Sequence, residues 1–438
     1  MLATPAGAAS DKGGPARTPP LATREQLAGE RMLLKLLSDP QVRTLRDSLG
    51  SELAASPLAD SPDAKSRAPF AVRLWTNSLI LREYAAGLAQ PAILWTNDNT
   101  PHSWFGHTIE GTGIAGDNPD HIYRYAALDG SGRYVIDGWI DRKHPPVQFS
   151  FEATHGTPAT FGASRSSKSP DMGDQIGMLT DRDIQVEKNG HFQLTIGGPA
   201  GGKNHLPLAP GSVSLNVRDV VSDWSQRPIR MTIRRIDRGS AKPLSYAELK
   251  GRILQDLPDY IHTWSSFHVG WLGGIKPNTI VGPVGRDGGW GYLAGGRFSL
   301  APGEAIQITT TRGPAAYTGV QVTDLWMIAP DGSRHLTSLN TSQARPNRDG
   351  TYTYVASPED PGVANWIDTG GLRDGYLILR WQQVPVGPKP EGLLREYKVI
   401  RIKDGLPAGV PLVTPGQRAA QMAKHRANYA NRIAPTRD

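Results

Sequence analysis

Apolar residues recur at helical spacing in the first part of the chain, behind a lead rich in Ala, Gly and Pro. Thr23 followed by Gln26 is a capping box, and it predicts a helix over 23–37. A second helix is predicted over 40–55. After a break that carries Pro and Ser, the apolar positions predict a third helix over 70–89, which we expect to pack on the rest of the protein.

From Ile93 onward the spacing of apolar residues shortens to two, which is typical of β-strands. The dipeptides Asp129-Gly130 and Asn189-Gly190 favour turns with positive φ and lie between strand-like runs, so each predicts a β-hairpin. The predicted strands are 121–128 and 133–140 around the first turn, 184–187 and 192–196 around the second, and 213–220, 229–236, 297–300, 305–311, 318–327, 351–356, 375–382 and 397–402.

Two further helices are indicated by capping boxes. Ser245 with Glu248 predicts a helix that ends near Leu257, followed by a Trp- and Gly-rich loop over 264–296 with little periodicity. Thr414 with Gln417 begins a last helix over 414–431, which we interpret as an appendage.

These elements predict a mainly β protein: two jelly-roll-like or β-sandwich units with an N-terminal helical arm and a C-terminal helix. The predicted organisation is a disordered lead (1–22), a helical arm (23–92), an N-terminal β domain (93–240), a helix with a connecting loop (241–296), a C-terminal β domain (297–405) and a basic C-terminal helix (406–438).

Composition removes several classes of function. The chain has 438 residues and no cysteine, so disulfides and thiolate sites cannot form. The segment 411–438 holds +4 of the formal charge of +7, and we do not interpret this local excess as a nucleic-acid interface. No apolar run approaches the ~18 residues that span a bilayer, and no signal-peptide pattern opens the chain. We therefore expect no membrane partner and a cytoplasmic location.

The C-terminal half contains distinctive phrases: Ser338-Leu-Asn-Thr-Ser-Gln-Ala344, Asp349-Gly350, Asp360-Pro-Gly-Val-Ala-Asn-Trp-Ile-Asp-Thr-Gly370 and Leu379-Arg-Trp381. Over roughly 297–383 the chain resembles the bacterial family called domain of unknown function 1214.

The N-terminal half resembles the companion domain of unknown function 1254. The phrase Asp117-Asn-Pro-Asp-His-Ile-Tyr123 is similar to its Asn-x-Asp-Thr-x-Tyr pattern, with His121 in place of the usual Thr. Asn204-His-Leu-Pro207 and Asp223-Trp224 also resemble that half. The resemblance implies two jelly-roll-like units with helical additions and a tendency to form homo-oligomers. It implies no particular reaction.

The acids inside these phrases lie in loops between strands, where a rigid sheet can direct them toward a ligand. A converging pair of carboxylates can act as general acid and general base. Equally, Asp and Asn beside Pro, Gly and Thr form turn caps that only satisfy the backbone. The candidate catalytic residues are Asp117, Asp120, Asp223 and Asp368.

Amides, aromatics and an arginine in the same phrases are candidate substrate contacts. The tryptophans can stack on a sugar ring or fill the core. Arg380 can bind a substrate carboxylate or pair with Asp368. The candidate substrate-binding residues are Asn118, Tyr123, Asn204, His205, Trp224, Asn340, Gln343, Asn365, Trp366, Arg380 and Trp381.

We predict no metal ligands and no cofactor. The pairs His102 with His107 and His262 with His268 lack the i, i+4 spacing of a helical zinc site. Calcium stays an open alternative at the oxygen-rich loops 117–120 and 171–183.

Two functional hypotheses remain. In the first, the protein is an enzyme, a hydrolase or lyase acting on a sugar-like small molecule or glycan with paired carboxylates. In the second, it is a non-catalytic oligomeric β-sandwich module that binds a ligand or serves as a structural element.

Overall fold

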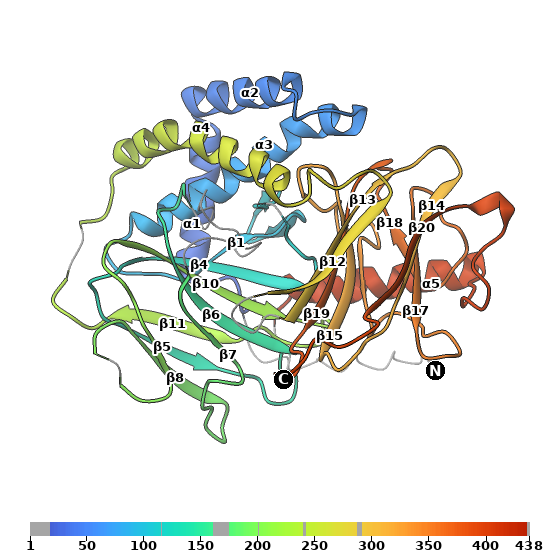
Figure 1. The fold of residues 1–438 in the computed structure, drawn as a ribbon. Helices are drawn as coiled ribbons and strands as arrows, with labels where there is room; N and C mark the ends of the chain where they lie inside the picture. The colour runs from blue at the N-terminus through green and yellow to red at the C-terminus, as the bar shows by residue number, and fades with distance from the viewer. Residues whose placement is uncertain are drawn as a thin grey trace, which may run out of the picture.

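A computed structural model describes residues 18–435 except 115, 161–174, 200, 240–241 and 287–290. Most of the predicted disordered lead, and part of the oxygen-rich loop 171–183, lie outside the described residues. Figure 1 shows two β-sandwiches side by side, four helices gathered over one end and a fifth helix along the C-terminal sandwich. The prediction of a mainly β protein with β-sandwich units is confirmed.

The N-terminal helices begin where short polar side chains cap them. Thr23, Asp39 and Ser61 each accept a backbone N–H from the first turn, at 3.0, 3.0 and 3.1 Å. The first two predicted helices are confirmed, but the third begins eight residues earlier than predicted, because Ser61 caps it and the helix continues through Pro69. The helices are α1 (Arg24–Leu37), α2 (Pro40–Ala55), α3 (Pro62–Ala86), α4 (Tyr246–Trp271) and α5 (Pro415–Tyr429), with short 3-10 turns η2 (Ile402–Asp404) and η3 (Ala430–Ile433).

The N-terminal sandwich pairs a five-stranded sheet, ordered β1-β4-β10-β6-β7, with a four-stranded sheet, ordered β11-β5-β8-β9. Aromatic rings of Phe149, Phe151 and Phe192 pack between the sheets. The strands are β1 (Leu94–Asn97), β4 (His121–Asp129), β5 (Tyr134–Trp139), β6 (Gln148–His155), β7 (Gln175–Thr180), β8 (His191–Ile196), β9 (His205–Leu206), β10 (Ser212–Val220) and β11 (Arg230–Arg235), with a small separate pair β2 (His102–Trp104) and β3 (His107–Ile109).

The C-terminal sandwich repeats this plan, with a sheet β12-β13-β19-β15-β16 facing a sheet β18-β17-β14-β20. The six strands predicted in this region all form. The strands are β12 (Thr279–Arg286), β13 (Gly291–Ser299), β14 (Glu304–Thr310), β15 (Tyr317–Thr323), β16 (Ser338–Asn340), β17 (Tyr352–Ser357), β18 (Trp366–Asp368), β19 (Asp374–Gln382) and β20 (Leu394–Arg401).

Neither predicted hairpin forms. Asp129-Gly130 carries the chain from β4 in one sheet to β5 in the facing sheet, so the turn is a corner of the sandwich. Asn189-Gly190 does make a tight turn, with Gly190 at φ +91°. The residues before it, 184–187, do not form a strand. The turn residues correctly predicted where the chain reverses direction. They carry no information about which strands pair with each other.

The prediction of a long loop over 264–296 is wrong. Helix α4 continues through Pro258 to Trp271, and its buried face follows a helical period at Leu257, Tyr260 and Trp264. Strand β12 and the start of β13 occupy most of the remainder. Glycines in β13 interrupt the alternation of apolar and polar residues by which a strand is recognised in a sequence. They make room for bulky neighbours: a Cβ at Gly296 would lie 2.8 Å from the Tyr397 ring.

Helix α5 is not an appendage. Its capping box forms as predicted, with Thr414 and Gln417 bonding reciprocally. The helix then packs along the C-terminal sandwich, where Arg418 is buried, and its end reaches the N-terminal sandwich, where Tyr429 and Arg432 are buried. Among the described residues, no helix is long and apolar enough to cross a bilayer.

Candidate functional site

The loop 116–120 fastens the N-terminal sandwich to the C-terminal one. The carbonyl oxygen of Gly116 accepts a hydrogen bond from Arg380 at 2.9 Å. The carbonyl oxygen of Asp117 accepts one from Gln321 at 2.7 Å, and the side-chain oxygen of Gln321 in turn accepts from Arg380. Because β15 and β19 supply these donors, the loop has a fixed position on the C-terminal sheet.

Asp120 is the main acceptor at this junction. The Tyr317 hydroxyl, the Asn340 amide and the Ser338 hydroxyl donate to its carboxylate at 2.7, 3.0 and 3.1 Å. The Asn118 amide donates to the Tyr317 hydroxyl at 3.1 Å. Burial raises the pKa of Asp120, and the three donors oppose that rise. The structure thus brings together three predicted residues, Asn118, Asp120 and Asn340, as a structural junction.

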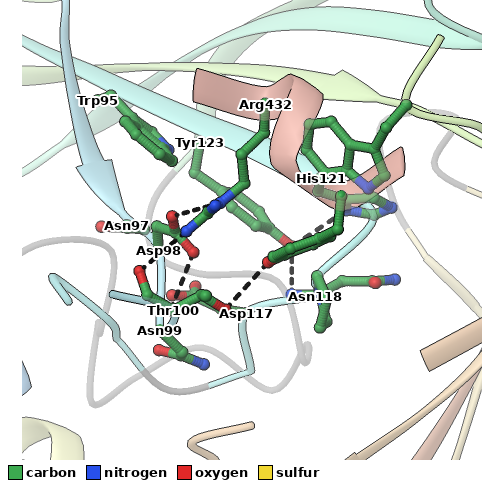
Figure 2. Close-up of a pocket in the computed structure, with 13 residues that line it drawn as sticks. Trp95, Asn97, Asp98, Asn99, Thr100, Asp117, Asn118, His121, Tyr123 and Arg432 are labelled. Atoms are coloured by element: carbon green, nitrogen blue, oxygen red, sulfur yellow. Dashed lines mark hydrogen bonds and ion pairs between the residues drawn. The ribbon is translucent and has the colours of Figure 1, made fainter. Parts of the chain in front are cut away.

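The same loop also lines a pocket (Figure 2), with about 310 Å³ of space that includes its open mouth. In this conformation the enclosed part has room for about one water molecule. Its aromatic lining consists of Trp95 from β1, Tyr123 from β4, Trp224, and Tyr429 from the end of α5. Residues from both ends of the chain therefore enclose one crevice.

A buried ion pair lies inside the pocket. Asp98 accepts from Arg432 Nε at 3.1 Å, and the side chains are only 10% and 4% exposed. Arg432 also donates to the carbonyl oxygens of Thr100 and Pro101, at 3.2 and 2.9 Å. The hydroxyls of Thr100 and Tyr429 lie 3.0 Å apart. These contacts tie the end of α5 to the loop that follows β1.

Asp117 is the second carboxyl group of the pocket. Its side chain is fully buried, and one backbone donor, the N–H of Ile114, reaches it at 3.1 Å. Burial, with a contribution from the negative charge of Asp98, raises the pKa of Asp117 to about 8 against the opposing effect of the Ile114 hydrogen bond. Asp117 therefore holds its proton more tightly than an exposed carboxyl group does, and it lies beside Asp98, which is paired with a guanidinium.

Helix α1 holds the aromatic wall of the pocket in place. The Gln26 side chain accepts from the backbone N–H of Trp95 at 2.8 Å and donates to its carbonyl oxygen at 3.2 Å. The Gln26 side chain thus makes the two backbone hydrogen bonds with Trp95 that a neighbouring strand would make. The predicted capping box is thus only half present: Thr23 caps the helix, but Gln26 is engaged with β1.

Behind Trp95, the buried carboxylate of Glu30 collects donors from the β2–β3 pair. Trp104 Nε1 lies at 2.6 Å, His107 Nε2 at 2.7 Å and His102 Nε2 at 3.2 Å. Burial works to raise the pKa of Glu30, but these hydrogen bonds, led by His102, lower it overall. His102 also stacks on Trp95, with ring centroids 4.9 Å apart. No cluster of three or more potential metal ligands occurs among the described residues.

The structure places four of the predicted residues in the pocket lining: Asp117, Asn118, Tyr123 and Trp224. Asp223 is adjacent in sequence to Trp224, yet its carboxylate caps the N–H of Ser225 at 2.8 Å and accepts from Asn428 at 3.3 Å. The turn-cap alternative describes Asp223 best.

The fourth candidate acid lies elsewhere. Asp368 pairs with His335 Nδ1 at 2.7 Å and caps the N–H of Gly370 at 2.8 Å, within the C-terminal sandwich. Asn204 and His205 belong to the N-terminal sandwich, where the Asn204 amide bonds the backbone of Gln185. None of these three residues is part of the pocket lining.

The remaining candidates are supports of the C-terminal sandwich. Gln343 accepts from the N–H of Asn340, and the Asn365 amide bonds the backbone of Arg345 on both its oxygen and its nitrogen. The indole N–H groups of Trp366 and Trp381 donate to carbonyl oxygens at 3.1 and 2.9 Å, and both rings belong to the core.

Sequence reasoning missed half of the pocket. Asp98, Asn99 and Trp95 lie in the run Trp95-Thr-Asn-Asp-Asn-Thr100, where five polar residues directly follow the apolar run 92–95. That change from apolar to polar at a strand end is a usable signal. Arg432 and Tyr429 gave none, because nothing in a basic helical sequence shows that its end is buried.

Comparison with known proteins establishes the fold alone. No family model and no curated protein matches the chain. Among solved structures, an uncharacterized protein from Burkholderia cenocepacia has 23% sequence identity and a TM-score of 0.66, covering 85% of this chain and 100% of that one. A protein from Vibrio parahaemolyticus has 9% identity and a TM-score of 0.38, covering 75% of this chain and 99% of that one. The first similarity shows that the arrangement of both sandwiches and their helices is shared.

Proposed function

We propose that the pocket is an active site in which Asp117 is the general acid and Asp98 the general base, acting on a small polar molecule. The observation that carries the proposal is the different surroundings of two carboxyl groups in one pocket: Asp98 forms an ion pair with Arg432, whereas Asp117 is buried and has one backbone donor among the described residues. Burial raises the pKa of Asp117 to about 8, whereas Asp98 is a carboxylate held by Arg432. Environments that separate two acids in this way are typical of acid–base pairs.

The chemistry that fits such a pair is hydrolysis or elimination at a carbon–oxygen bond. Asp117 gives its proton to the leaving oxygen as the bond breaks. In hydrolysis, Asp98 takes a proton from the attacking water; in elimination, it takes the proton from the neighbouring carbon. Each turnover leaves Asp98 protonated and Asp117 ionised, and exchange with solvent restores the starting state.

This pair replaces the one that the sequence suggested. Asp120, Asp223 and Asp368 are engaged as structural acceptors, so only Asp117 keeps its predicted role. We also propose membership of the family of domain of unknown function 1214, with an N-terminal half of the 1254 type, on the phrases quoted above. The junction at Asp120 supports that proposal, because it joins a phrase from each half.

The test is a hydrolysis and elimination screen against glycosides, lactones and sugar acids, with wild type beside Asp117→Asn, Asp98→Asn and the control Asp368→Asn. We expect turnover in wild type and in the control, and a loss of about 100-fold or more in both pocket variants. In wild type, activity should fall as pH rises above about 8, because Asp117 loses its proton. Equal turnover in Asp117→Asn and wild type would eliminate the proposed acid.

A non-catalytic binding module is the second candidate, and the structural hydrogen bonds that engage three of the four candidate acids, Asp120, Asp223 and Asp368, favour it. In that case ligands bind in the pocket without reaction. A ligand that raises the melting temperature of wild type, but is recovered unchanged after prolonged incubation, supports the module rather than the enzyme.

A further inference from the structure

The pocket contains an asparagine whose side chain has no protein partner among the described residues. Asn99 is 6% exposed, and neither its amide nitrogen nor its amide oxygen makes a hydrogen bond there. An unsatisfied buried polar atom costs about 1–3 kcal/mol, so such an amide is rarely retained without a purpose. Trp95 is 4% exposed, and its indole N–H also makes no hydrogen bond with the described residues.

The other two asparagines of the pocket show what a structural role looks like. The Asn97 oxygen accepts from Ser78 and from Arg82, both at 3.3 Å. The Asn118 oxygen accepts from the N–H of Asp120 at 2.9 Å. Three asparagines therefore line one crevice, and only Asn99 leaves both ends of its amide without a partner among the described residues.

The surroundings of Asn99 keep its amide in place. A Cβ on Gly113 would lie 1.6 Å from the Asn99 oxygen and 3.6 Å from the Asp117 carboxyl oxygen Oδ2. The absence of a side chain at Gly113 thus leaves the room that Asn99 occupies. Both oxygens lie close to one point on the backbone, so the Asn99 amide and the proposed acid are neighbours.

We infer that Asn99 and the Trp95 indole are the ligand-recognising groups of the pocket, and that they take a vicinal diol of a neutral sugar or polyol. A primary amide offers one acceptor beside one donor, so it can accept from one hydroxyl group and donate to its neighbour. The indole N–H supplies a donor for a further oxygen. This inference deepens the proposed function and rests on it for the reaction, but not for binding.

Two other properties of the pocket select the same ligand class. The charges of Asp98 and Arg432 offset each other at 3.1 Å, so this pair offers no net charge to a charged ligand. The rings of Trp95, Tyr123 and Trp224 offer flat apolar walls to the C–H face of a sugar. The amide and indole atoms are closed off in this conformation, so a ligand reaches them only if the crevice widens.

Calorimetric titration tests the inference with methyl hexopyranosides of different hydroxyl configuration, myo-inositol, and glucuronate as the charged probe. We expect at least one neutral probe to bind wild type at millimolar concentration or better, and glucuronate to bind more weakly. Asn99→Leu, which keeps the volume of the side chain, should weaken that binding about 10-fold or more. Trp95→Phe, which removes only the N–H and part of the ring, should weaken it less.

Stability measurements show whether a loss of binding in Asn99→Leu comes from the lost amide or from a less stable fold. Asn365 is a matched control, because it is equally buried but bonds Arg345 and Thr353 through its amide. Asn365→Leu should lower the melting temperature, whereas Asn99→Leu should leave it unchanged or raise it. If Asn99→Leu does not fold, Gly113→Ala displaces the amide instead and should weaken the same probe.

The outcomes separate the two proposals. Binding that Asn99→Leu abolishes and Asp117→Asn preserves supports the inference, whether or not the probe is turned over. Failure of every neutral probe to bind wild type, or equal binding by Asn99→Leu, overturns the inference. The acid–base proposal is judged separately, by turnover in Asp117→Asn.

Discussion

Asp117 and Asp120 stand three residues apart in one loop, both fully buried, and yet the two carboxyl groups are in different situations. Three side chains of the C-terminal sandwich donate to Asp120. Among the described residues, one backbone N–H reaches Asp117, which lines the pocket beside a second acid. The difference lies in the supply of hydrogen-bond donors, not in burial.

This contrast shows how one loop can combine a structural and a chemical task. The donors around Asp120 fix the loop on the C-terminal sandwich, and that fixed backbone holds Asp117 away from water. Where donors surround a buried carboxyl, it stabilises the fold; where they are missing, its proton becomes available for transfer. The predictions below test each side of this comparison.

The largest effect is expected at the ion pair beside Asp117. Arg432→Met keeps the aliphatic volume but leaves Asp98 buried without its cation, and breaking a buried pair costs about 3–5 kcal/mol. Urea unfolding followed by tryptophan fluorescence measures this loss. The double variant Arg432→Met/Asp98→Leu should recover part of it, and no recovery would mean that the packing of Arg432, not its charge, matters.

A somewhat smaller loss is expected at the junction. Asp120→Leu leaves the Tyr317 hydroxyl, the Ser338 hydroxyl and the Asn340 amide without their acceptor, for a loss of about 2–4 kcal/mol. The change should make the two sandwiches unfold in separate steps, which calorimetry detects as a broadened or split transition. A single transition with unchanged midpoint would contradict the role of Asp120 as a junction.

Asp117→Asn should change the pH dependence of stability. The pKa of Asp117 is about 8 in the folded protein and near 3.8 when exposed, so the folded state binds the extra proton in between. Wild type therefore loses stability as pH rises from about 4 through 8, and the asparagine variant lacks this loss. Between pH 6 and 8 the variant should gain about 2 kcal/mol relative to wild type. A constant difference across that range would exclude the raised pKa.

The smallest effect is expected at Asp368, the predicted acid outside the pocket. Asp368→Asn weakens the pair with His335, whose side chain is 36% exposed, so the loss should stay below about 1 kcal/mol. Asp368 raises the pKa of His335 in the folded protein. The stabilisation that this pair gives wild type is therefore complete below the pKa of an unfolded histidine, and it disappears as pH rises through the raised pKa of the folded state. Melting curves at acidic and alkaline pH should differ from wild type only on the acidic side.

The elements with strong local signals were predictable from the sequence. Capped helices such as α2 and the alternating strands of the C-terminal sandwich form where the pattern indicates. The pairing of β4 and β5 was not predictable, because Asp129-Gly130 has the same local chemistry at a hairpin and at a corner between sheets. The length of α4 was missed because Pro258 normally ends a helix, whereas here the buried face around it outweighs that cost.

Only part of the candidate site was predictable from the sequence. Asp117 became a candidate because it lies in a polar loop whose phrase resembles a family pattern. Its partners could not be predicted, because Asp98 and Arg432 are 334 residues apart and meet only through the tertiary fold. Sequence separation also explains why Asp120 could not be identified as a junction residue, although it looks equivalent to Asp117. Its donors come from β15 and β16, which lie far along the chain.

The long sequence separation of the pocket contacts also bears on how the protein folds. Each sandwich can collect its own strands through shorter loops, but the contacts of Asp98 with Arg432 and of Thr100 with Tyr429 close loops that span most of the chain. Contacts of such high sequence separation form late, because the entropy of the whole intervening chain must be lost first unless other contacts have already shortened it. We therefore expect the crevice to be assembled after the two sandwiches have formed.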